Sequence, residues 1–174
     1  MYQIGEVLVS REKIEEMLKR VSDEINRDYA GQEILMVGVL KGAMVFLADL
    51  MRRINVPVIL DVIVVSSYGV ETQSSGVVLL VKDIDMDIEG KHVIIVEDLI
   101  DTGVTLKYLK DMFNSRNPAS LKICAAFDKY ERRKVEIDVD YVGISIPDKF
   151  VIGYGLDFAN MYRNIPELCV LEEV

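Results

Sequence analysis

The sequence predicts an α/β protein built on a mainly parallel β-sheet, and two observations support this fold class. Short apolar segments typical of buried strands alternate with segments whose apolar residues recur at helical spacing. Polar loops also follow several strand segments, and α/β proteins place their ligands at the carboxyl ends of parallel strands. The length of 174 residues fits one domain with a sizeable core.

Three helices are predicted. Residues 10–30 carry apolar residues at helical spacing between Ser10, a suitable N-cap, and Gly31, which can end a helix. A mostly apolar helix is expected at 43–54, and a further helix is expected at 104–115.

The strands are predicted from short apolar runs bounded by polar or turn-forming residues. They are expected at 34–40, 58–65, 77–81, 91–96, 121–127 and 141–144. The small polar residues of 66–76 predict a mobile loop between two of these strands.

Composition excludes several classes of protein. Hydrophobic residues make up 51% of the chain, which argues against disorder, and no apolar run approaches the length of a membrane span. The net charge of −9 argues against a nucleic-acid partner, because phosphate backbones require a basic surface. With no signal peptide and two cysteines in apolar stretches, we expect a cytoplasmic protein with reduced thiols. The single His92 argues against a zinc site.

The segment 91–106, KHVIIVEDLIDTGVTL, is the most informative part of the chain. Two carboxylates, Glu97 and Asp98, stand where a buried strand should end, and a loop of small and hydroxyl residues then precedes a helix. Free backbone N–H groups at such a helix start bind phosphate. The carboxylates would repel phosphate but suit sugar hydroxyls and a divalent cation. These features together predict a site for a sugar phosphate with a free diol.

This segment resembles the phosphoribosyl pyrophosphate (PRPP) motif of type I phosphoribosyltransferases, in which an apolar run, two acids, two apolar residues and Asp-Thr-Gly-x-Thr follow one another. The resemblance implies that Glu97 and Asp98 hold the ribose diol and its Mg²⁺ shell. We interpret Asp101, at the loop entrance, as the general base that takes the purine N7 proton. The PRPP-binding residues are then Glu97, Asp98, Asp101, Thr102, Gly103, Val104 and Thr105.

A second segment, 146–157, resembles the purine-binding hood of the hypoxanthine-guanine branch of this family. The resemblance implies that Phe150 stacks on the purine ring and that the Val151 backbone bonds the base edge. Asp157 would help hold Mg²⁺, and Arg163 would bind pyrophosphate as a planar donor fork.

Two shorter segments support the resemblance by their order and spacing. Leu40, Lys41 and Gly42 follow a predicted strand where the family binds pyrophosphate, and the resemblance places a cis peptide bond between Leu40 and Lys41. The opening of the polar loop matches the family's flap, which closes over the reacting centre. The flap residues are Ser66, Ser67, Tyr68 and Gly69.

Lys129 follows the predicted strand 121–127. Its ammonium can only donate hydrogen bonds, so it would donate to the O6 atom of a 6-oxopurine and reject adenine, whose 6-amino group also presents donors. Members of the family that use 6-oxopurines carry such a lysine. Many of them place proline after it, whereas this chain has Tyr130, which could alter the loop without removing Lys129.

The resemblance spans essentially the whole chain and implies a type I phosphoribosyltransferase fold, with a twisted sheet flanked by helices and a small hood over the site. Residues 1–174 would form a single domain, with a core at about 30–145 and a hood from the N-terminal segment and about 146–174. The expected activity is purine salvage: Mg²⁺-dependent transfer of phosphoribose from PRPP to hypoxanthine, and to guanine, by a homodimer or homotetramer.

Two alternatives remain open. A PRPP-sensing regulator could use the same fold, although such proteins usually add a DNA-binding domain or a basic surface. A phosphoribosyltransferase for adenine, xanthine or orotate is the nearer rival, and Lys129 argues against adenine. Backbone carbonyls near Val151 and Asp157 would accept the 2-amino group of guanine and repel the 2-oxo group of xanthine, so guanine should be the better substrate.

Overall fold

The computed structural model describes residues 2–67 and 78–173. Its centre is a six-stranded sheet in the order β4-β3-β2-β5-β6-β7, in which every neighbouring pair is parallel except β3 and β4. The prediction of a mainly parallel sheet is therefore confirmed. The strands are β2 (Ile34–Leu40), β3 (Val58–Ser67), β4 (Val78–Lys82), β5 (His92–Ile100), β6 (Ser120–Asp128) and β7 (Tyr141–Ser145).

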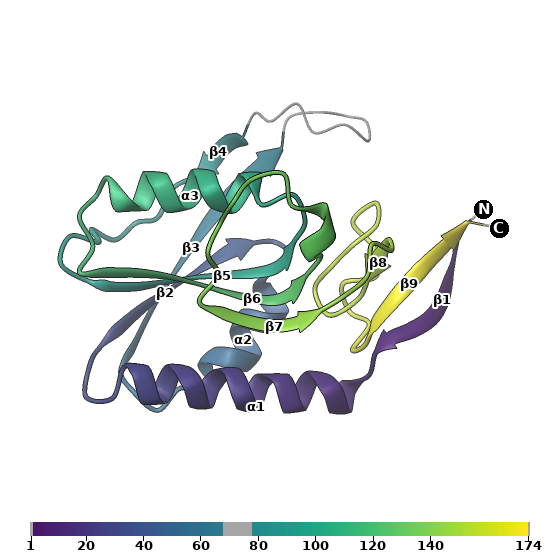
Figure 1. The fold of residues 1–174 in the computed structure, drawn as a ribbon, viewed down its shortest axis with the longest axis horizontal. Helices are drawn as coiled ribbons and strands as arrows, with labels where there is room; N and C mark the ends of the chain where they lie inside the picture. The colour runs from purple at the N-terminus through teal and green to yellow at the C-terminus, as the bar shows by residue number, and fades with distance from the viewer. Residues whose placement is uncertain (1, 68–77, 174) are drawn as a thin grey trace.

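Helices cover both faces of this sheet (Figure 1). Helices α1 (Arg11–Asp28) and α2 (Met44–Met51) lie on one face, and α3 (Val104–Asn114) lies on the other. Alternate residues of β5 reach the two cores: Ile94 packs on the α1 and α2 side, and Ile95 packs on the α3 side. Burial on both faces explains why the central strands are almost continuously apolar in sequence.

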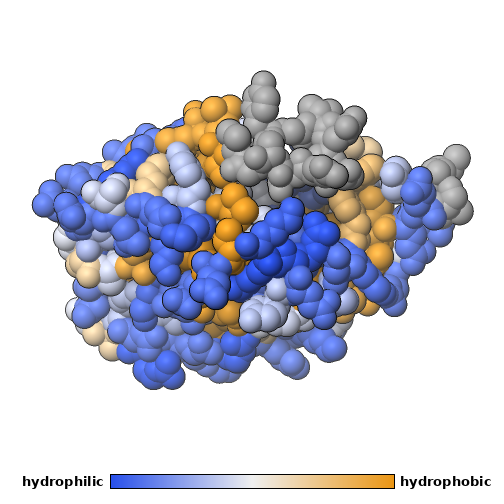
Figure 2. Space-filling model, turned by 45° about the horizontal axis from the view of Figure 1, so that its top comes forward, coloured by the Kyte–Doolittle hydropathy of each residue, from blue (hydrophilic) through white to orange (hydrophobic). Residues whose placement is uncertain are grey.

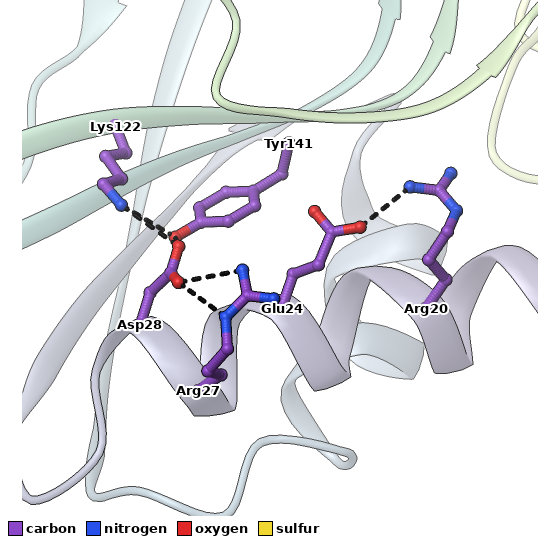
Figure 3. Close-up of polar contacts among 6 residues, drawn as sticks. All are labelled: Arg20, Glu24, Arg27, Asp28, Lys122 and Tyr141. Carbon is purple, nitrogen blue, oxygen red and sulfur yellow. Dashed lines mark hydrogen bonds and ion pairs between the residues drawn. The ribbon is translucent and has the colours of Figure 1, made fainter.

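The predicted start of α1 is confirmed, because the Ser10 hydroxyl caps the helix by accepting a hydrogen bond from the Lys13 N–H at 3.3 Å. Its other end is fastened to the sheet by a polar cluster (Figure 3). The Asp28 carboxylate accepts hydrogen bonds from the Tyr141 hydroxyl at 2.8 Å and from the Lys122 ammonium at 3.3 Å. No helix in the described ranges is long and apolar enough to cross a membrane.

A second, three-stranded antiparallel sheet forms the hood in the order β1-β9-β8. It joins β1 (Tyr2–Val9) to β8 (Val151–Ile152) and β9 (Leu168–Glu173), and Figure 1 shows the two ends of the chain side by side at its tip. The hood lies on the side toward which the parallel strands run. These strands were not predicted from the sequence, since β8 has only two residues and β1 exposes residues on both of its faces.

Several predicted boundaries are wrong, and two of them differ most from the structure. The strand expected to end at residue 96 continues to Ile100, because Glu97, Leu99 and Ile100 extend the pairing of β5 with β6. The helix expected at 43–54 ends at Met51, where the following turn is held by Asn26, whose amide donates to the Arg53 carbonyl at 3.0 Å. Of the predicted flap residues, Ser66 and Ser67 extend β3, while Tyr68 and Gly69 lie outside the described residues.

Candidate active site

A cavity of about 430 Å³ opens at the carboxyl ends of β2 and β5, and we call it the loop cavity. It is lined by most of the residues predicted for the PRPP and pyrophosphate sites, together with buried strand residues. Those predicted residues are Leu40, Gly42, Glu97, Asp98, Asp101, Thr102, Gly103, Thr105 and Arg163. Asp157, predicted for the metal and the base, also lines it. Lys41, whose side chain is exposed, and Val104 do not line it.

A second cavity of about 570 Å³, the hood cavity, lies between the end of β6 and the hood. Its walls include the predicted base-binding residues Lys129, Phe150 and Val151. Both cavities are bordered by Asp98, Leu99, Asp101 and Asp157. Asp101 therefore stands at the junction of the two cavities.

The loop before α3 is shaped for close approach to a ligand. Gly103, the N-cap residue, adopts a φ of 82°, a left-handed conformation that favours glycine. The Thr102 hydroxyl accepts a weak hydrogen bond from the Val104 N–H at 3.4 Å. Because the first turn of a helix has N–H groups without intrahelical partners, this end of α3 offers donors and partial positive charge to an anion in the loop cavity.

Glu97 and Asp98 are adjacent carboxylates at the cavity wall, held within β5. Burial raises the pKa of Glu97, and the negative charge of Asp98 raises it further. Burial likewise raises the pKa of Asp98. A cation or hydroxyl donors at this position would stabilise both carboxylates in their charged form.

The loop after β2 packs directly against these carboxylates. The Leu40–Lys41 peptide bond is cis, as the resemblance implied. A side chain at Gly42 would place its Cβ 1.8 Å from Oδ2 of Asp98, so only glycine allows this approach. From the hood side, a Cβ at Gly155 would lie 2.3 Å from the Gly42 carbonyl oxygen. The hood and the loop are thus in backbone contact above the loop cavity.

Arg163 and Asp157 bring charge from the hood into the same cavity. The Arg163 Nη2 and Asp157 Oδ1 atoms are 2.7 Å apart, and Nη1 of Arg163 donates to the Gly155 carbonyl at 2.7 Å. Glu97, Asp98 and Asp157 were the predicted metal residues. Within the part of the chain that the structure describes, no three acidic, histidine or cysteine side chains come close enough to hold a metal by themselves. A metal here would need ligand oxygens as well.

The hood cavity is lined by one buried cation, Lys129, and by the aromatic ring of Phe150. Lys129 is only 7% exposed, and its Nζ atom lies 3.9 Å from Oδ1 of Asp148. Tyr130, in place of the proline found in many relatives, begins a short 3₁₀ turn and points into solvent, so Lys129 stays at the cavity. Phe150 is 54% exposed and meets Phe158 edge-on. Figure 2 shows hydrophobic residues at the hood end of this face, on the right, and also in its upper middle part.

Comparison with known families matches the chain to the Phosphoribosyl transferase domain over residues 7–159. The chain belongs to the phosphoribosyltransferase family.

Individual relatives agree with this assignment. A protein named hypoxanthine-guanine phosphoribosyltransferase from Streptococcus agalactiae serotype V is 50% identical over 98% of this chain and 94% of its own length. A crystal structure of a hypoxanthine-guanine phosphoribosyltransferase from Bacillus anthracis, with HEPES in its active site, is 46% identical and matches with a TM-score of 0.92 over 99% of this chain and 100% of that one. A hypoxanthine phosphoribosyltransferase from Staphylococcus aureus is 42% identical, with a TM-score of 0.93 over 97% and 92% of the two chains.

Two residues of this site, Arg132 and Asp148, were not predicted from the sequence. The Arg132 Nε donates to Oδ1 of Asp101 at 2.8 Å, and its Nη1 lies 3.5 Å from Oδ2 of Asp148. Both residues line the hood cavity. Arg132 belongs to the charged run 131–134, and nothing in its spacing shows that Arg132 faces the site while Arg133 turns to Asp128.

Proposed function

We propose that this phosphoribosyltransferase is a purine-salvage enzyme that transfers the 5-phosphoribosyl group from PRPP to hypoxanthine or guanine, giving IMP or GMP and pyrophosphate. The observation that carries the proposal is the junction of the two cavities at Asp101, with an anion-binding helix start on one side and the buried Lys129 on the other. The names of the relatives support the same reaction.

The loop cavity would hold PRPP. The N–H groups of the first turn of α3, with Thr102 and Thr105, would bind the 5′-phosphate, and Glu97 and Asp98 would accept hydrogen bonds from the ribose diol. Pyrophosphate would lie between the loop of Leu40, Lys41 and Gly42 and the guanidinium of Arg163. Mg²⁺, when bound, would neutralise negative charge on the leaving pyrophosphate. The oxygen-only donor set of Glu97, Asp98 and Asp157 fits this hard cation.

The hood cavity would hold the base. Lys129 would donate to O6, Phe150 would stack on the ring, and the backbone of Val151 would bond the base edge. As the glycosidic bond to pyrophosphate breaks, C1 of the ribose becomes cationic, so holding the two substrates in line supplies much of the catalysis. Asp101, at the junction, would accept the proton from N7 as N9 of the base bonds to C1.

Closure, location and assembly complete the proposal. The flap of Ser66, Ser67, Tyr68 and Gly69 would cover the reacting centre and exclude water.

Both cysteines are free and buried, which agrees with a reducing cytoplasm. We expect a homodimer or homotetramer, and light scattering of the purified protein would distinguish these states.

The test is a product assay with PRPP and Mg²⁺ that offers hypoxanthine, guanine, xanthine and adenine separately. We expect IMP and GMP to form, less product from xanthine, and none from adenine. Turnover of adenine would contradict the role given to Lys129. If PRPP bound but no base gave a nucleotide, the proposal would fail in favour of a PRPP-sensing regulator.

A further inference from the structure

Four charged side chains of alternating sign follow one another along the wall of the hood cavity: Asp101, Arg132, Asp148 and Lys129. The successive nitrogen–oxygen distances are 2.8 Å, 3.5 Å and 3.9 Å. The two ends of this charged chain are the residues assigned to proton transfer and to base recognition. Arg132 is its central cation.

The contact between Arg132 and Asp101 uses one carboxylate oxygen. The Arg132 Nε donates to Oδ1 of Asp101. Among the described residues, no hydrogen bond to the other oxygen, Oδ2, is found. The guanidinium therefore fixes the orientation of the carboxylate while leaving one oxygen available to a substrate in the junction.

The planar guanidinium of Arg132 also contacts Asp148. Its Nη1 approaches Oδ2 of Asp148 while Nε contacts Asp101. A lysine ammonium is a point charge without this fork and could not hold both carboxylates in the same geometry. The Asp101 side chain is 42% exposed and that of Arg132 is 43% exposed, so an ion pair of this kind contributes little to folding stability.

We propose that Arg132 is a positioning residue, which holds Oδ1 of Asp101 so that Oδ2 faces the purine nitrogen and which links this carboxylate through Asp148 to Lys129. This inference rests on the proposed function. It predicts that loss of Arg132 slows turnover without weakening PRPP binding or the fold.

The test compares Arg132→Gln and Arg132→Lys with Lys107→Gln as the matched control. Lys107 also forms a half-exposed ion pair, with Asp111, but lines neither cavity. We expect Arg132→Gln to lower kcat by ~10-fold to 100-fold, a part of the ~10²–10⁴ that a general base contributes. Arg132→Lys should recover only a minor part of this loss. The KM for PRPP should stay within about two-fold, and Lys107→Gln should match the wild type.

A double-mutant cycle separates positioning from a general structural effect. If Arg132 acts through Asp101, then Arg132→Gln should cause little further loss of kcat in the Asp101→Asn background. Asp148→Asn provides a second test that leaves Arg132 in place, and it should lower kcat/KM for hypoxanthine by several-fold with unchanged PRPP binding.

Three results would overturn the inference. The kcat of Arg132→Gln could equal that of the wild type, or Arg132→Gln could lower kcat by the same factor in the Asp101→Asn background as in the wild type. Arg132→Gln could also weaken PRPP binding as much as it lowers kcat. An Arg132→Gln variant that does not fold would also contradict it, since the pair is expected to contribute little to stability. A wild-type protein that forms no nucleotide would overturn the proposed function as well, so the wild-type assay distinguishes the two failures.

Discussion

Lys129 shows how a single buried side chain can set the choice of base. It is 7% exposed and its closest described carboxylate, on Asp148, is 3.9 Å away, so a substrate oxygen could provide a shorter contact. An ammonium offers donors only, which suits O6 of hypoxanthine and not the amino group of adenine.

We therefore predict that Lys129→Ala raises the KM for hypoxanthine by ~10-fold or more, because a hydrogen bond to a charged group contributes about 1.5–3 kcal/mol. The affinity for PRPP, measured by calorimetry, should change by less than about two-fold. Lys149→Ala is the control, because Lys149 follows Asp148 in sequence but pairs with Glu6 on the exposed side of the hood. Equal losses for both substrates would indicate a phosphate-binding role for Lys129 instead.

At the residue scale, sequence predicted best where function depends on one contiguous segment. Glu97 through Thr105 supply a strand end, a loop and a helix start in order, and nine of the predicted PRPP and pyrophosphate residues line the loop cavity. Arg132 could not be predicted, because its role depends on how the turn after β6 folds toward Asp101.

Secondary-structure elements were predictable where both faces are buried. The central strands β2, β5 and β6 carry long apolar runs, and α1 has a recognisable cap in Ser10. The end of β5 was not predictable, because it depends on pairing with β6 rather than on hydrophobicity. The hood strands were missed because short or two-sidedly exposed strands lack a clear alternating pattern.

The attachment of α1 to the sheet gives a stability prediction. Asp28 accepts hydrogen bonds from Tyr141 and Lys122, and the Tyr141 hydroxyl is the main cause of its lowered pKa. We predict that Asp28→Asn lowers the free energy of unfolding by about 1–2 kcal/mol at pH 7. A control is Asp111→Asn, since Asp111 is 61% exposed in its pair with Lys107 and should matter little.

The pH dependence of this effect follows from the direction of the pKa shift. A carboxylate with a lowered native pKa stabilises the fold fully above its unfolded pKa of about 3.9. That stabilisation is lost as the pH falls through the native value. In urea unfolding, the free energy of unfolding lost in Asp28→Asn relative to the wild type should be constant from pH 7 to about pH 5. This loss should shrink below about pH 3.9. A loss of unfolding free energy that grew as the pH fell would contradict the lowered pKa of Asp28.

On the scale of the whole molecule, the hood is built from both ends of the chain and rests on the core loop after β2. The Tyr154 hydroxyl adds a hydrogen bond across this contact to Asp49 on α2, at 2.9 Å. Sequence indicated a hood and a core, but it could not show that the first and last strands pair, because this pairing joins residues far apart in the chain.

We propose that hood and core form a single domain, which predicts that they unfold together. Gly155→Ala should destabilise both, because Gly155 has a φ of 98° and its added Cβ would lie 2.3 Å from the Gly42 carbonyl. Gly90→Ala is the control, since Gly90 has a φ of 70° but open space around its Cβ position. Hydrogen exchange followed by mass spectrometry should show equal destabilisation of hood and core peptides in Gly155→Ala, and a larger loss than in Gly90→Ala. Faster exchange in Gly155→Ala that was limited to hood peptides would indicate that hood and core are two separate folding units.

The central claim is that chemistry occurs at Asp101, where the two cavities meet. The most direct test is a rapid-quench measurement of IMP formation in one turnover by the wild type and by Asp101→Asn, together with the Kd for PRPP of each protein. We predict that the rate falls by ~10²–10⁴, as expected for a lost general base, while the Kd for PRPP changes by less than about three-fold. An unchanged single-turnover rate in Asp101→Asn would contradict the account.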